Sequence, residues 1–315
     1  MKRSTLLLVG LLIVLVIAYY FMYVAPSGER ESSYKTPDLK ISFDSASVAK
    51  IEIHGPGGKS VTVENTGGQW MVTSPVRYKA NTSNVTEFLS GLAKFKVGSL
   101  VSSNPAKANL FSVDSSEGTK LSVTDRSNKT TTLVIGKSGP AYTDFYFRTE
   151  TGKEVYLGEG PQSYMLNREV KEWRDKSIFT GIQDSIRTFT VEYGDKEYKL
   201  FKPGMNWTMN GDSIANTDVT PILSSLCALN ASDFVDTLPK FDSKPITFKV
   251  QSGIGGTVTE LNFYPMPPDS ARYFVQTSNT TQVFTILKWT VTQLTRPFAP
   301  KETPKAVTKG KKGKK

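Results

Sequence analysis

Residues 70–95 read WMVTSPVRYKANTSNVTEFLSGLAKF, and residues 207–229 repeat their pattern as WTMNGDSIANTDVTPILSSLCAL. In each stretch a tryptophan closes a strand-like run, an Ala-Asn pair follows (Ala80-Asn81 or Ala215-Asn216), and apolar residues with helical spacing come next. Five apolar pairs are all separated by 134 residues, and such an internal repeat indicates a duplicated fold. The pairs are Val85 and Val219, Phe88 and Ile222, Leu89 and Leu223, Leu92 and Leu226, and Phe95 and Leu229.

The residues around the first stretch predict short antiparallel strands and one helix. Apolar residues near alternate positions from Val48 to Ile53 predict a strand, and glycine-rich turns separate it from two more strands. The helix follows, and we expect Asn84 to cap it, with Asp218 as the cap of its counterpart. Later strands are predicted at residues 121–123, 133–135, 145–147 and 155–157, and a short element ends at 164–166.

The second copy contains the same series of elements. Its strands are predicted at residues 186–193, 198–201, 206–209, 246–250, 258–263, 273–275 and 283–286. Late in the copies, Tyr146-Phe147 matches Tyr273-Phe274 at an offset of 127, and Leu166 matches Leu294 at 128, as Val155 matches Val283. The decrease of the offset from 134 to 127 or 128 indicates that loops of the second copy are a few residues shorter. The series predicts an α+β fold in which each helix covers one face of an antiparallel sheet.

These patterns divide the chain into seven segments. We expect a cytoplasmic N-terminus at 1–5, a transmembrane helix at 6–25, a linker at 26–42, an α+β repeat at 43–170, a junction at 171–177, a second α+β repeat at 178–296 and a disordered lysine-rich tail at 297–315.

The membrane prediction depends on an uninterrupted run from Leu6 to Ala25. These 20 residues carry no charge, which is about the length that an α-helix needs to cross a bilayer. A cleaved signal peptide is the alternative, but its apolar core is usually shorter, and Tyr23-Val24-Ala25-Pro26 is a poor cleavage site. Because Lys2 and Arg3 precede the run, the sequence predicts a single-pass membrane protein with its N-terminus in the cytoplasm and most of the chain outside it.

The composition argues against several classes of site. The formal net charge is +10, but residues 301–315 hold seven lysines and one glutamate, so the predicted folded part is only mildly basic. We therefore expect no nucleic-acid partner. The chain has one histidine, His54, and one cysteine, Cys227, which argues against a histidine-rich or cysteine-based metal site, and we expect no cofactor.

Two features of the sequence could indicate catalysis. Gly58-Lys59-Ser60 looks like the end of a phosphate-binding loop, but the first glycine of that loop would fall on Ile53 and a strand follows instead of a helix. We interpret the triplet as a turn. Carboxylates such as Asp114 and Asp144 are scattered beside turn residues, although a pair assembled in space could support acid–base chemistry. A carboxylate-based hydrolase therefore stays an alternative.

One short segment between the copies is the candidate contact site. It reads Trp173-Arg174-Asp175-Lys176. Its aromatic ring and charges fit a contact surface for a partner, or a lock between domains with an Arg–Asp pair above a packed tryptophan. We favour the structural role.

The ordered set of short motifs resembles the bacterial family called domain of unknown function 4340. The residues that carry the resemblance include Phe43-Asp44, Trp70, Phe111-Ser112-Val113-Asp114, Ile135-Gly136 and the segment at 173–176. Ser112 and Val113 depart from the family's usual Phe-Gly-Leu-Asp pattern, which concerns a turn. Such proteins are often found beside components of gliding-motility-type ABC transporters, so the resemblance implies an accessory role in the envelope.

We therefore expect a non-enzymatic, membrane-anchored accessory or scaffold protein whose partners are the bilayer, through residues 6–25, and an ABC transporter permease or a related envelope protein. The alternatives are a module that binds peptidoglycan or another envelope polysaccharide, and the carboxylate-based hydrolase. Exposed aromatic residues and the basic tail motivate the polysaccharide alternative.

Overall fold

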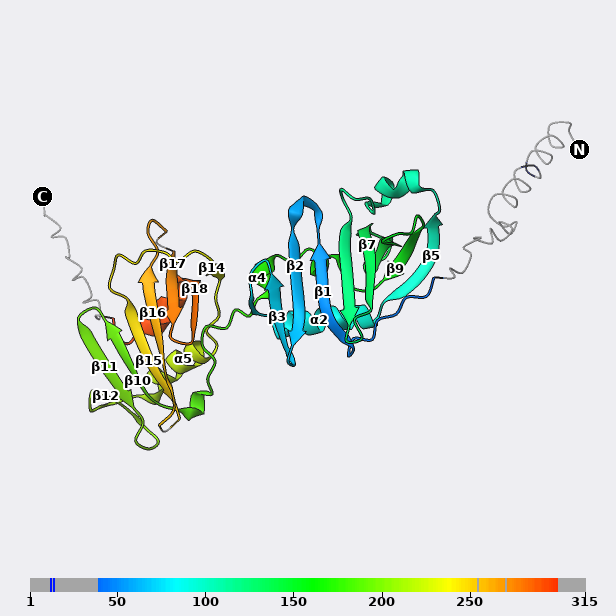
Figure 1. The fold of residues 1–315 in the computed structure, drawn as a ribbon. Coiled ribbons are helices and arrows are strands. Elements are labelled where there is room, and N and C mark those ends of the chain that lie inside the picture. Colours follow the sequence, from blue (N-terminus) through cyan, green and yellow to red (C-terminus); the bar gives the residue numbers. More distant parts are fainter. Residues whose placement is uncertain (1–11, 13, 15–38, 254, 270, 300–315) are drawn as a thin grey trace, which may run out of the picture. The chain divides into compact units, whose positions relative to one another are not determined.

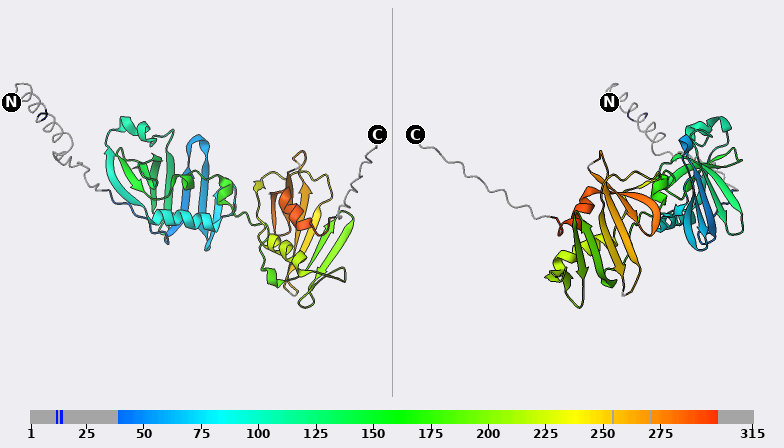
Figure 2. Two further views of the ribbon diagram at one scale, coloured as in Figure 1. Left: turned by 180° about the vertical axis from the view of Figure 1, so that it is seen from behind. Right: turned by 60° about the vertical axis from the view of Figure 1, so that its left-hand side comes forward.

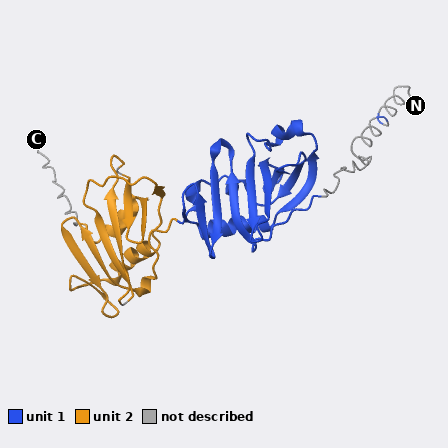
Figure 3. Ribbon diagram, in the orientation of Figure 1, with its two compact units in different colours: residues 1–175 blue, residues 176–315 orange. Residues whose placement is uncertain are grey.

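The structure, a computed structural model, describes residues 12, 14, 39–253, 255–269 and 271–299, which form two compact units that divide between Asp175 and Lys176 (Figure 3). Within these residues no helix has the length and apolar character needed to cross a membrane. The predicted transmembrane helix at 6–25 lies almost entirely outside the described residues, as does most of the predicted tail at 297–315.

Unit 1 is a nine-stranded antiparallel sheet with the strand order β4-β3-β2-β1-β6-β7-β8-β9-β5 (Figure 1). The sheet forms because apolar residues alternate with polar ones and glycine-rich turns join neighbouring strands. Its strands are β1 Val48–His54, β2 Ser60–Thr66, β3 Gln69–Ser74, β4 Tyr78–Lys79, β5 Lys96–Ser102, β6 Thr119–Asp125, β7 Thr130–Ser138, β8 Asp144–Thr149 and β9 Val155–Glu159. Its helices are η2 Pro56–Gly58, α2 Thr82–Ala93, η3 Pro105–Phe111, α3 Ser163–Leu166 and α4 Val170–Trp173.

Unit 2 repeats this topology, because its order β13-β12-β11-β10-β15-β16-β17-β18-β14 places each strand where its counterpart lies in unit 1. The structure thus confirms two tandem antiparallel-sheet units. The strands are β10 Ile186–Tyr193, β11 Lys196–Phe201, β12 Trp207–Met209, β13 Asp212–Ile214, β14 Asp233–Val235, β15 Ile246–Ser252, β16 Val258–Pro265, β17 Arg272–Thr277 and β18 Thr280–Leu287. The helices are η4 Gln183–Ser185, α5 Asn216–Cys227 and α6 Lys288–Thr295.

The two tryptophans and the two long helices occupy equivalent places. Trp70 lies in β3 and Trp207 in the equivalent β12, and the 12-residue helices α2 and α5 begin 134 residues apart. The predicted caps are wrong by one turn. Asn81 is the N-cap of α2, and its side-chain oxygen accepts a hydrogen bond from the backbone N–H of Asn84 at 3.1 Å. Asp218 likewise lies in the first turn of α5, where its negative charge interacts favourably with the positive end of the helix dipole.

The N-caps also correct the match between the Ala-Asn pairs. The N-cap of α5 is Ala215, which has no capping side chain and stands 134 residues after Asn81. Asn81 is thus equivalent to Ala215 and not to Asn216, so the sequence match was displaced by one residue.

The late Tyr-Phe match is displaced in the same way. Phe147 pairs with Ile135 across β8 and β7, and Val275 pairs with Phe263 across the equivalent strands. Phe147 is therefore equivalent to Val275, at the offset of 128 that also relates Val155 to Val283, and both side chains are fully buried. A shift of one residue turns a strand's side chains to the opposite face, which is why burial excludes the offset of 127.

In each unit the long helix lies on one face of the sheet and the core is between them (Figure 2). On α2, Val85, Phe88 and Leu92 are buried in the core of unit 1, whereas Leu89 is only partly buried at its margin. All five matching positions of unit 2 are buried: Val219, Ile222, Leu223, Leu226 and Leu229. Packing reaches slightly beyond the predicted repeats, because Leu39 contacts the core of unit 1 and Phe298 is buried in unit 2.

Candidate functional site

The segment that follows β9 holds the first three of the predicted contact residues against unit 1. Trp173 is fully buried, and its ring packs edge-on against Phe88 of α2 with the ring centroids 5.5 Å apart. The carbonyl oxygen of Trp173 accepts a hydrogen bond from the N–H of Asn81 at 2.7 Å. The tryptophan therefore joins the end of unit 1 to the start of its long helix.

Arg174 and Asp175 continue this attachment along β4. The Arg174 guanidinium lies over the ring of Tyr78, 4.8 Å from its centroid, and is nearly fully buried. Asp175 forms an ion pair with Lys79 at 2.9 Å. Burial, with a smaller contribution from the Asp175 charge, raises the pKa of Tyr78. Lys176 belongs to unit 2, where its carbonyl oxygen accepts a hydrogen bond from the N–H of Ala231 at 2.7 Å.

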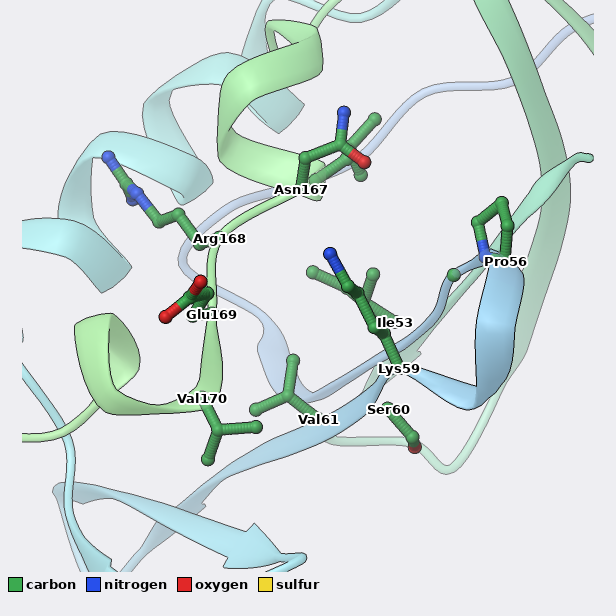
Figure 4. Close-up of a pocket in the computed structure, with 11 residues that line it drawn as sticks. Ile53, Pro56, Lys59, Ser60, Val61, Asn167, Arg168, Glu169 and Val170 are labelled. Atoms are coloured by element: carbon green, nitrogen blue, oxygen red, sulfur yellow. The ribbon is translucent and has the colours of Figure 1, made fainter.

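The same segment borders a cavity of about 450 Å³ in unit 1 (Figure 4). It opens between the β1–β2 hairpin on one side and the chain from Leu166 to Val170 on the other. Its volume is within the range of small-ligand sites, about 300–1,000 Å³. The lining residues are Ile53, Gly55, Pro56, Lys59, Ser60, Val61, Leu166, Asn167, Arg168, Glu169 and Val170. We call this cavity the hairpin pocket.

The floor of the hairpin pocket is apolar because inward positions of two adjacent strands supply it. Ile53 of β1 and Val61 of β2 are paired in the sheet, and both are buried. In Figure 4 the side chain of Val170 points toward them from the opposite wall. An apolar group that enters the pocket would therefore lose water on both sides.

Two of the charged residues around the hairpin pocket are already engaged in the structure of unit 1. Arg168 is directed away from the pocket toward α2 (Figure 4), where its guanidinium forms an ion pair with Glu87. Hydrogen bonds from the Tyr164 hydroxyl and then from Arg168 lower the pKa of Glu87. Glu169 forms an ion pair with Lys171 at 3.0 Å, and it forms a capping box with Glu172 at the start of α4.

Lys59 differs from these two residues. It is exposed at the end of the β1–β2 hairpin, and no described residue forms an ion pair or hydrogen bond with its ammonium group. Figure 4 shows the side chain extending toward the segment from Asn167 to Val170. The hairpin pocket therefore combines an apolar floor with one cation that is available to a ligand.

A second cavity, of about 430 Å³, lies on the other face of the same hairpin. Successive residues of a strand point to opposite faces, so His54 lines this cavity whereas Ile53 lines the hairpin pocket. Two carboxylates line the cavity. Glu150 is paired with Lys120, and the carboxylate of Asp114 accepts hydrogen bonds from the N–H and hydroxyl of Ser116, which lower its pKa.

Comparison with known proteins gives one match. The family model described as "Domain of unknown function (DUF4340)" matches residues 70–251, more than half of the chain. The chain belongs to the DUF4340 family. This finding confirms the resemblance drawn from the short motifs, and the match runs from Trp70 in β3 to Gln251 in β15, so it spans both units. No curated protein and no solved structure matches the chain.

Sequence reasoning did not find the hairpin pocket of this DUF4340 protein. The two walls are more than 100 residues apart in the chain, and no spacing pattern connects them. Gly58-Lys59-Ser60 was correctly interpreted as a turn, since η2 ends at Gly58 and β2 begins at Ser60. That turn carries Lys59 and forms one wall, but five residues between β1 and β2 is an ordinary hairpin length and gave no signal.

Proposed function

We propose that this chain is a non-enzymatic accessory or scaffold protein that works with an ABC-transporter-type complex of the bacterial envelope. In this proposal residues 6–25 anchor it in the inner membrane, and the two units lie outside the cytoplasm. The family resemblance motivates the transporter, and the uncharged run motivates the membrane anchor.

The observation that carries the binding role is the composition of the hairpin pocket. A general acid or base must be free to exchange a proton with its substrate. Glu169 is the one acidic residue among the described residues that line the pocket, and it already pairs with Lys171 and caps α4, so the lining offers no pair of carboxylates for acid–base chemistry. An apolar floor beside a single available lysine instead favours recognition of a group with an apolar part and a negative charge.

Cross-linking in intact cells tests this function. The tagged full-length protein is cross-linked to its neighbours, solubilised in detergent and purified, and the attached proteins are identified by mass spectrometry. We expect a transporter permease to be enriched over an unrelated single-pass protein with the same tag. Recovery of no transporter subunit in repeated experiments would overturn the proposal.

A polysaccharide-binding module is the second candidate, and exposed aromatic rings favour it. Tyr142 is 80% exposed and Trp289 is 68% exposed, and flat rings of this kind can stack on sugars. Sedimentation with isolated cell wall distinguishes the two functions. Because Phe298 is buried in unit 2, the tail should be removed after Ala299 in the matched control. No sedimentation of either form would exclude this candidate.

Of the two cavities described above, the one lined by Asp114 and Glu150 is the candidate site for a carboxylate-based hydrolase. A general acid of such an enzyme needs a raised pKa, whereas the hydrogen bonds to Asp114 lower its pKa. The lowered pKa argues against Asp114 as the general acid, and this supports the two binding functions over the hydrolase.

A further inference from the structure

The duplication allows the hairpin pocket to be compared with the equivalent place in unit 2. In unit 1, Ile53 of β1 is flanked by Val61 of β2 and Leu121 of β6. In unit 2, Val191 of β10 is flanked in the same register by Tyr198 and Phe248. Val61 is therefore equivalent to Tyr198, and Leu121 is equivalent to Phe248.

In unit 2 this place is filled by aromatic side chains. Phe298 is buried, and the centroid of its ring lies 5.1 Å from the ring centroid of Tyr198 and 6.4 Å from that of Phe248. The hydroxyl of Tyr198 donates a hydrogen bond to the carbonyl oxygen of Phe298 at 3.2 Å. The chain that follows α6 thus inserts its own phenylalanine against the sheet.

In unit 1 the counterpart of this phenylalanine is a valine. Val170 follows Leu166 by four residues, just as Phe298 follows the equivalent Leu294 by four. Val170 and Val61 both line the hairpin pocket. Where unit 2 has two contacting rings, unit 1 has two smaller side chains and a cavity of about 450 Å³.

We propose that the hairpin pocket binds an aromatic side chain carried by an acidic peptide segment of a partner protein. The ring takes the place that Phe298 occupies in unit 2, on Ile53 and Val61, and the acidic part of the segment faces Lys59. Burial of an aromatic ring supplies most of the affinity, and the lysine selects against basic segments. This inference deepens the proposed partner binding and rests on it.

Short peptides test the pocket without the cellular partner. The probe is acetyl-Glu-Pro-Phe-Glu-amide, in which Pro-Phe copies Pro297-Phe298. The controls are the same peptide with alanine in place of phenylalanine, and a peptide with both glutamates replaced by lysine. Binding to the full-length protein in detergent is measured by ligand-observed NMR. We expect the probe to bind at least tenfold more tightly than either control.

Variants then locate the binding. Val61→Tyr with Val170→Phe installs the aromatic residues of unit 2 and should reduce affinity at least tenfold. Lys59→Glu lies on the exposed hairpin and should weaken the acidic probe while improving binding of the lysine-containing control. In unit 2, Tyr198→Val with Phe298→Val reproduces both valines of unit 1, and it should open an equivalent cavity and add a second binding site. A thermal melt of each variant shows that it is folded.

Three results would overturn the inference. They are equal binding of the phenylalanine and alanine peptides, unchanged affinity in the filled variant, and no effect of Lys59→Glu. If the filled variant fails to fold, Lys59→Glu and the single Val170→Phe change decide the question. Peptide binding without a cross-linked transporter would sustain the pocket and reject the transporter, whereas the opposite result would reject the pocket alone.

Discussion

Shortening one buried leucine in each long helix should weaken the two units separately and by similar amounts. Leu92 of α2 and Leu226 of α5 stand 134 residues apart, and both are fully buried between helix and sheet. A leucine-to-alanine change at such a site usually costs about 2–5 kcal/mol, because apolar contacts are lost and a cavity remains. A 12-residue helix is marginal by itself, so each helix depends on this packing.

Urea unfolding with hydrogen exchange and mass spectrometry measures the effect in each unit. With a slope of about 2 kcal/mol per molar urea, a loss of about 3 kcal/mol lowers a midpoint by about 1.5 M. We expect Leu92→Ala to lower the protection of backbone amides from exchange in peptides from residues 39–175, and to leave peptides from residues 176–299 nearly unchanged. Leu226→Ala should have the reverse effect. Equal losses in both units from either change would refute separate folding, and a loss below about 1 kcal/mol would refute the packing.

Three further predictions concern the buried Phe298, the carboxylate of Glu87 and the proposed membrane anchor. Phe298→Ala should destabilise unit 2 by about 3–5 kcal/mol, whereas Met205→Ala at an 87% exposed site should change stability by less than about 0.5 kcal/mol in the same melt. Tyr164→Phe should raise the pKa of Glu87 in an NMR titration, because the hydrogen bond from the Tyr164 hydroxyl is the largest cause of the lowered pKa. The stability that this carboxylate contributes is present above the pKa of an unperturbed glutamate, and it is lost as the pH falls through the lowered pKa of the folded protein. A periplasm-specific reporter fused after Lys315 should be active, and the protein should stay in the membrane after a high-salt wash; release by salt would contradict the proposed anchor.

The elements that the sequence predicted best are those whose burial follows a simple period. The limits of β10 were predicted as observed, and the apolar spacing of α2 and α5 located both helices. The edge strands were missed. β4, β13 and β14 have only two or three residues each, and none of the seven residues of β5 is buried, so none of the four edge strands shows a clear alternation of buried and exposed residues.

The errors of one residue have a common physical cause. Two residues of the same kind beside each other, such as Tyr146-Phe147 and Tyr273-Phe274, do not show which one faces the core. Strand pairing decides this, because Phe147 opposes Ile135 and Val275 opposes Phe263. The error of three residues in the cap of α2 has another origin: asparagine occurs at both 81 and 84, and only the backbone conformation shows that the helix begins after Asn81.

The hairpin pocket could not be predicted from the sequence because it forms where unit 1 has smaller side chains than unit 2 at equivalent positions of the fold. Val61 and Val170 occupy the positions at which unit 2 has Tyr198 and Phe298, and this comparison is the basis for inferring an aromatic ligand. The four positions become comparable only when the sheet register is known.

Site-specific photo-cross-linking in living cells tests the central claim most directly. A photoreactive residue is placed at Asn167, which lines the hairpin pocket, and in a matched strain at Met205, an exposed position of unit 2. We predict a cross-link from position 167 to a transporter permease, through a segment with an aromatic and an acidic residue, and its loss in the Val61→Tyr, Val170→Phe background. An absent cross-link at 167, or one that is equally strong at 205 and unaffected by filling the pocket, would contradict the claim.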